Sequence, residues 1–98
     1  MLITIVDENG DAALDINITS VKISLQNQAG SFINSIDRTA ISAVNSQTHT
    51  FSAANMLIED ETKKEELRIL TVEATVLTVV CIQQIKFIVQ NMVLIPHA

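Results

Sequence analysis

The stretch TVLTVVCIQQIKFIVQNMVLIP, from Thr75 to Pro96, decides the class of this protein because it is nearly all apolar. A membrane-spanning helix needs about 20 consecutive, predominantly apolar residues. This stretch instead carries Lys86 near its centre, which alone costs roughly 2.5 to 3.5 kcal/mol on insertion scales, and several side-chain amides besides. We therefore expect no membrane span.

The residues before and within this stretch alternate as β-strands do. From Arg68 onward the even-numbered positions are apolar, the odd positions of residues 71–75 are polar, and from Leu77 both sets become apolar. A second apolar run follows Gln83-Gln84. The density of β-branched residues favours two long antiparallel strands that become covered on both faces. A helix across residues 72–92 is the alternative that the pattern leaves open.

The sequence pattern in the N-terminal third of the chain predicts a β-hairpin. Leu2–Val6 is a short β-branched run, and the Asn9-Gly10 pair that follows is a strong turn signal because both residues tolerate positive φ. A returning strand would use the alternating apolar positions of residues 14–18 and then those of residues 21–25. The phase of alternation slips by one between these two sets, which predicts a bulge or corner near Thr19-Ser20.

The middle of the chain gives weaker signals, rich in Ser, Thr, Asn and Ala. We expect a turn at residues 28–31 and a weak strand over residues 32–36. Two short strands, over residues 39–45 and 49–53, would flank a polar turn at residues 45–48.

The only long charge run, Glu59 to Glu66, follows this region. Its acids and lysines have the spacing of i,i+3 and i,i+4 pairs on a short helix, and a solvated loop is the alternative. The sequence therefore predicts an all-β fold, mainly an antiparallel sandwich or barrel, with one short helix or charged loop near residues 53–66. Residues 1–98 form a single β-rich domain in this interpretation, because one domain usually takes about 100 to 200 residues.

The composition indicates that part of the surface is covered by other chains. Of the 98 residues 48% are hydrophobic and 17% charged, and the mean hydropathy is +0.35. A domain this small leaves much of its surface in water, so an apolar surplus points to contacts between chains. The candidate interface residues all lie in the C-terminal strands: Val76, Val80, Ile82, Phe87, Val89 and Val93.

Several classes of function are disfavoured by the residues present. A net charge of −5 repels phosphate backbones, so no nucleic-acid partner is expected. His49 and His97 have no metal-ligand spacing, and no glycine-rich phosphate loop is present. Cys81 stands alone among apolar neighbours, which indicates a buried, inert thiol and a reducing compartment of synthesis. We expect no enzyme activity, no cofactor and no metal site.

Two classes of function remain. The first is a structural or assembly subunit that packs with other copies of itself or with other structural chains, as virion components of capsid, tail or baseplate do. The second is a soluble β-barrel or sandwich that binds a small apolar ligand or a peptide, with Phe32, Phe51 and Phe87 near a cavity. Beyond synthesis in a reducing compartment, and a virion as one setting, the sequence does not indicate where the protein resides.

Overall fold

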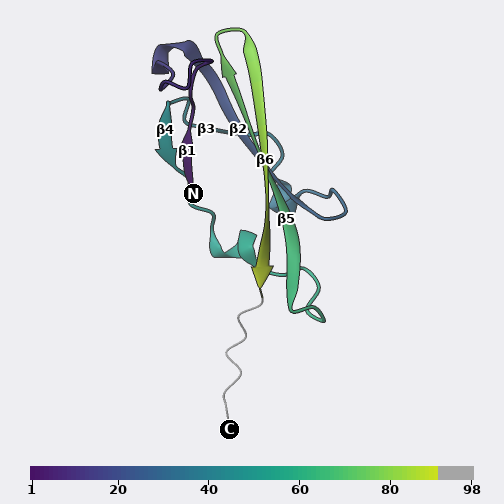
Figure 1. Cartoon of the computed structure of the whole chain (residues 1–98). Coiled ribbons are helices and arrows are strands. Elements are labelled where there is room, and N and C mark those ends of the chain that lie inside the picture. The colour runs from purple at the N-terminus through teal and green to yellow at the C-terminus, as the bar shows by residue number, and fades with distance from the viewer. Residues whose placement is uncertain (91–98) are drawn as a thin grey trace.

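A long β-hairpin dominates the fold in a computed structural model of the chain, which describes residues 1–90 (Figure 1). Strands β5 (Glu65–Val76) and β6 (Val79–Gln90) pair in antiparallel fashion along their whole length. The prediction of two long antiparallel strands is therefore confirmed, but the division of the second run from the first at Gln83-Gln84 is wrong, and the helical alternative is wrong over the described residues. The turn lies at Leu77-Thr78, where Leu77 has φ of 56°, and Gln83-Gln84 lie within β6.

Strand β2 (Ile18–Asn27) is the second central strand. The order in the four-stranded sheet is β3-β2-β5-β6, and β3 (Thr39–Ile41) forms the short edge. Val21, Ile23 and Leu25 are buried on one face of β2, as their alternation predicts. The predicted irregularity near Thr19-Ser20 is confirmed, since the pairing of β2 with β5 shifts register between Ile18 and Ser20.

The predicted N-terminal hairpin is only partly correct. The turn forms, because Gly10 has φ of 82° and its N–H donates to the carbonyl of Asp7 at 3.0 Å. The expected return strand is absent over residues 14–17; the strand begins only at Ile18 and pairs with β5. Residues 15–17 form the short 3-10 helix η1 (Asp15–Asn17), and Leu14 and Ile16 are exposed.

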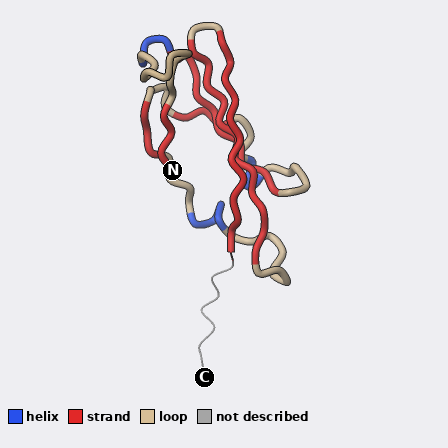
Figure 2. Tube along the Cα trace, viewed as in Figure 1, coloured by secondary structure: helices blue, strands red, loops and turns tan. Residues whose placement is uncertain are grey.

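Strand β1 (Leu2–Thr4) instead pairs with β4 (Ser46–Thr48), which occupies the position predicted to be a turn. This two-stranded sheet lies beside the four-stranded one (Figure 2). Residues 49–53 and 32–36, both expected as strands, contain no strand of their own. The second of these segments holds η2 (Ile33–Ser35), in which Asn34 and Ser35 have positive φ.

The charge run is mainly a loop. A single 3-10 turn, η3 (Ala53–Met56), precedes it, and β5 begins at Glu65. The predicted short helix or charged loop near residues 53–66 thus takes both forms in succession. Charged side chains remain solvated in such a loop, so no amphipathic helix is needed to hold them.

The hydrophobic core lies between the β1–β4 sheet and one face of the four-stranded sheet, called here the inner face. Buried side chains from both sheets form a single cluster, comprising Ile3, Ile5, Ala13, Ile18, Val21, Ile23, Leu25, Ile33, Leu70 and Ala74. This cluster draws on β1, β2 and β5 but on no residue of β6. The fold is therefore all-β and antiparallel, with one layer narrower than the other.

Candidate functional site

Strand β6 is an edge strand with many exposed apolar side chains. It forms one edge of the four-stranded sheet, and among the described residues no strand pairs with its far side. Val80, Ile82 and Ile88 are 53%, 64% and 50% exposed. Their cross-strand neighbours on β5 include Thr75 and Glu73, so these three side chains lie on the outer face, away from the core.

The inner face of β6 is also uncovered over much of its length. Cys81 and Ile85 lie opposite the buried residues Ala74 and Leu70 of β5, yet both are exposed. The prediction of a buried Cys81 is therefore wrong for the single chain. Its apolar sequence neighbours belong to an edge strand that the narrow β1–β4 layer does not reach, so they do not enclose the thiol.

The predicted interface residues separate into three groups. Val80 and Ile82 lie exposed on the outer face of β6. Val76 and Phe87 are partly buried and pack against the core, and Val89 is 5% exposed. Val93 lies outside the described residues.

Sequence reasoning missed other exposed apolar residues of the hairpin, namely Leu77, Val79, Ile85 and Ile88. The sequence shows that these positions are apolar, but it does not show where the turn between the two strands lies. Placing the turn at Leu77-Thr78 makes β6 an edge strand along its entire length, and the core covers its inner face only near Phe87 and Val89.

A groove of about 380 Å³ runs between β1 and β6. Residues 1–6 form one wall, and the opposite wall includes Val72, Ala74, Cys81 and Ile85. Phe32, Phe51 and Phe87 are not among the lining residues of this groove. The cavity expected near the three phenylalanines is thus not found at this place.

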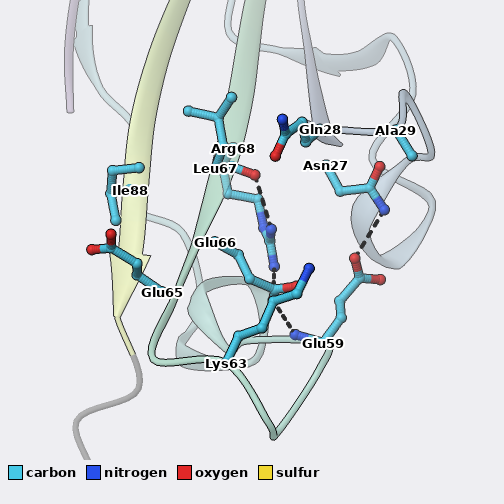
Figure 3. Close-up of a pocket in the computed structure, with 10 residues that line it drawn as sticks. All are labelled: Asn27, Gln28, Ala29, Glu59, Lys63, Glu65, Glu66, Leu67, Arg68 and Ile88. Atoms are coloured by element: carbon cyan, nitrogen blue, oxygen red, sulfur yellow. Dashed lines mark hydrogen bonds and ion pairs between the residues drawn. The ribbon is translucent and has the colours of Figure 1, made fainter.

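A second hollow of about 530 Å³ lies at the opposite end of the hairpin, around Arg68 (Figure 3). The Arg68 side chain is completely buried, which is rare for a charged group. Its Nη2 donates to the carbonyl of Leu57 at 3.1 Å and to Oε1 of Glu66 at 3.3 Å. Its Nη1 donates to the carbonyl of Leu67 at 3.0 Å, while its Nε has no partner among the described groups.

Two glutamates connect this arginine to the charged loop. Desolvation raises the pKa of the Glu66 carboxyl, but hydrogen bonds from the Glu59 N–H and from Arg68, with the charge of Arg68, outweigh it and hold that pKa below its usual value. Glu59 in turn accepts from Nδ2 of Asn27 at 2.9 Å (Figure 3). These contacts fasten the loop to the ends of β2 and β5.

The charges around this hollow argue against an anion site. Glu59, Glu65 and Glu66 line it together with Lys63 and Arg68, so acids outnumber bases. The bonding capacity of Arg68 is largely used by backbone carbonyls and by Glu66. We interpret the hollow as a structural anchor of the loop.

The remaining chemistry-bearing residues form no further site in the part of the chain that the structure describes. His49 packs edge-on against Phe51 with ring centroids 4.7 Å apart, and His97 lies outside the described residues. Within residues 1–90 no three His, Cys, Asp or Glu side chains are grouped so that they could hold a metal ion. No helix among these residues is long and apolar enough to cross a membrane.

Comparisons with known proteins leave β6 and its groove as the candidate site on structural grounds alone. No protein-family model, no curated protein and no solved structure matches this chain.

Proposed function

We propose that this protein is a non-enzymatic structural subunit, which assembles with copies of itself or with other structural chains through strand β6. The observation that supports this proposal is a 12-residue edge strand with exposed apolar side chains on both faces. Long apolar edges favour pairing with another chain, and proteins that stay monomeric usually shorten, bend or charge such edges.

The free energy gained by covering the outer face of β6 is small. Fully burying a Val or Ile side chain contributes about 1.5 to 3 kcal/mol. Because Val80, Ile82 and Ile88 are 50 to 64% exposed, covering all three would contribute roughly 2.5 to 5 kcal/mol. Association loses about 4 to 15 kcal/mol of translational and rotational freedom. The outer face alone is therefore too small, and the edge and the inner face must contribute.

This arithmetic favours an assembly with several contacts per subunit. A strand added at the edge satisfies backbone groups but covers the side chains of β6 only in part, so each face still needs further cover. Multi-chain shells, tubes and baseplates provide such repeated contacts. Within this class we propose a virion component, of the capsid, tail or baseplate kind, as the first setting to test.

A second candidate function is the binding of a small apolar ligand or an extended peptide. The groove between β1 and β6 favours it, because its volume of about 380 Å³ falls within the range of roughly 300 to 1,000 Å³ that is typical of ligand sites. A peptide could also add a strand to the edge of β6. In this case the isolated protein would be a monomer.

Light scattering coupled to size exclusion over a dilution series tests the assembly. Two variants, Ile82→Lys and Leu57→Lys, place the same charge at side chains that are both 64% exposed. A lysine at position 82 would face Glu73 across the strand pair, so the fold should persist. We expect multimers for the parent chain and for Leu57→Lys, and monomers for Ile82→Lys. Monomers of the parent chain at every concentration would refute self-assembly.

A further inference from the structure

The hydrogen bonds of the inner strands determine which backbone groups of β6 face its free edge. The N–H groups of Leu25 and Asn27 donate to the carbonyls of Ile36 and Ser31, on the side of β2 away from β5. In antiparallel sheets successive residues of a strand point their N–H and C=O groups to alternate sides. Even-numbered residues of β2 therefore face β5, where their partners are odd-numbered.

The same alternation continues to the outer edge of the sheet. Even-numbered residues of β5 must face β6, and their partners there are odd-numbered. The free edge thus presents the N–H and C=O groups of the even-numbered residues of β6: Val80, Ile82, Gln84, Lys86, Ile88 and Gln90.

The edge side chains within three residues of Ile85 are symmetrical in polarity about it, whereas Val80 and Gln90, five residues to either side, differ in polarity. Ile82 and Ile88 lie three residues to either side, and Gln84 and Lys86 lie one residue to either side. In an isologous two-fold contact a residue i meets residue j of the second copy while j meets i, so such pairs must be mutually compatible. We infer that β6 pairs in antiparallel fashion with β6 of a second copy, in the register that places Ile85 opposite itself. This inference rests on the proposed assembly and specifies its contact.

The neighbouring registers are less favourable because of one charge. Lys86 is the only charged residue of β6. Moving the two-fold axis by one residue toward the C-terminus would place Lys86 opposite itself, and like charges directly opposite are destabilising. Moving the axis by one residue the other way would place Lys86 opposite Ile82. With the axis at Ile85, each Lys86 meets the amide of Gln84, and each Ile82 meets Ile88.

The two edges of the sheet also favour self-pairing of β6. The opposite edge is β3, which has three residues against 12 in β6. A head-to-tail contact between β6 and β3 would leave most of β6 unpaired. Pairing of β6 with itself uses the whole edge, and the resulting eight-stranded sheet ends on both sides at the short β3.

The chemistry of the edge suits a second copy better than an unrelated acidic or basic chain. The protein carries 11 acidic residues, but none lies in β6, so two copies meet where their mutual repulsion is smallest. The two inner faces would lie on the same side of the combined sheet. The two grooves beside β1 would then flank the dimer axis.

Disulfide trapping tests the register. Odd-numbered residues of β6 form the pairs without hydrogen bonds across the new contact, where Cα atoms are about 4.5 Å apart, within the range of roughly 4.4 to 6.8 Å that disulfides accept. In a Cys81→Ser background, Ile85→Cys would place two thiols at the axis. Gln83→Cys is the matched control, because it lies on the same face and would meet Phe87 of the second copy.

We expect mild oxidation to convert Ile85→Cys into covalent dimers several-fold more completely than Gln83→Cys, on non-reducing gels. Melting curves of both reduced variants should match that of Cys81→Ser, which shows that the fold is intact. Equal trapping of both, preferential trapping of Gln83→Cys, or trapping of neither in a chain that scatters as a multimer would overturn the register while leaving assembly intact. A parent chain that scatters as a monomer would overturn the pairing together with the proposed assembly.

Discussion

Two isoleucines of the same sheet provide a direct test of the division between folding and assembly. Ile23 on β2 is 2% exposed and belongs to the core, whereas Ile82 on β6 is 64% exposed. Truncating a buried isoleucine to alanine typically costs about 2 to 5 kcal/mol. For Ile23→Ala we therefore expect the melting temperature to fall by roughly 8 to 40 °C, since 1 kcal/mol corresponds to about 4 to 8 °C in a domain of this size.

Ile82→Ala should behave differently because about two-thirds of its side chain is already in water. Only the remaining third of its contacts is lost on truncation, so the free energy of unfolding of the monomer should fall by about 1 kcal/mol. The dissociation constant of the assembly should also rise, because in the proposed register Ile82 loses its contact with Ile88 of the second copy.

Urea unfolding of dilute monomer, followed by circular dichroism, gives the first quantity, and light scattering over a dilution series gives the second. The m-value should be the same for both variants, which shows that the surface exposed on unfolding is unchanged. Equal destabilisation of the monomer by the two substitutions would refute the view that Ile82 lies outside the core. An unchanged dissociation constant for Ile82→Ala would refute its place in the contact.

Proline substitutions should distinguish the backbone groups at the free edge of β6 from those that bind β5. Gln84→Pro removes an N–H at the free edge, so it should abolish assembly with little change in the melting temperature. Gln83→Pro removes a hydrogen bond to β5 and should lower the melting temperature. Thiol labelling of Cys81 under native conditions should be fast in dilute monomer and several-fold slower in the assembly, and equal rates would contradict the contact. Arg68→Ala should lower the free energy of unfolding by about 3 to 5 kcal/mol in urea titrations, because it leaves a cavity and unpaired carbonyls in the buried network. The pKa of Glu66 is lowered in the folded state, so the carboxylate stabilises the fold at a pH above its pKa in the unfolded chain, and this stabilisation is lost as the pH falls through its pKa in the folded chain. Glu66→Gln should therefore reduce the loss of stability in acid. An unchanged dependence of stability on acid pH would refute this role.

Local periodicity accounts for the parts of the fold that the sequence predicts well. Val21, Ile23 and Leu25 alternate because one face of β2 packs on the core, and the slip in phase before them corresponds to the shifted register at Ile18 and Ser20. The two long C-terminal strands follow from the same period of two. Burial against the chain's own core leaves this signal in the sequence.

The pairing of strands that lie far apart in the sequence leaves no such periodic signal. Leu14 and Ile16 alternate like a strand, but β1 pairs with β4 instead, and both side chains remain exposed. The turn at Leu77 contains no glycine or asparagine, and Leu77 adopts φ of 56° because strand pairing on both sides fixes the turn. The position of this turn decides which strand is the edge, so the candidate contact could be named only in part from the sequence.

Lys86 connects the monomer with the proposed assembly. In the single chain it lies on the outer face, opposite Ile69 of β5, where water solvates its charge and makes the edge less attractive to arbitrary strands. A lone lysine in an apolar edge is a common protection against uncontrolled pairing. Within the proposed contact the same charge meets the amide of Gln84, and it disfavours the register that would place Lys86 opposite itself. Both effects come from a single side chain, which protects the free edge of the monomer and narrows the choice of register in the dimer.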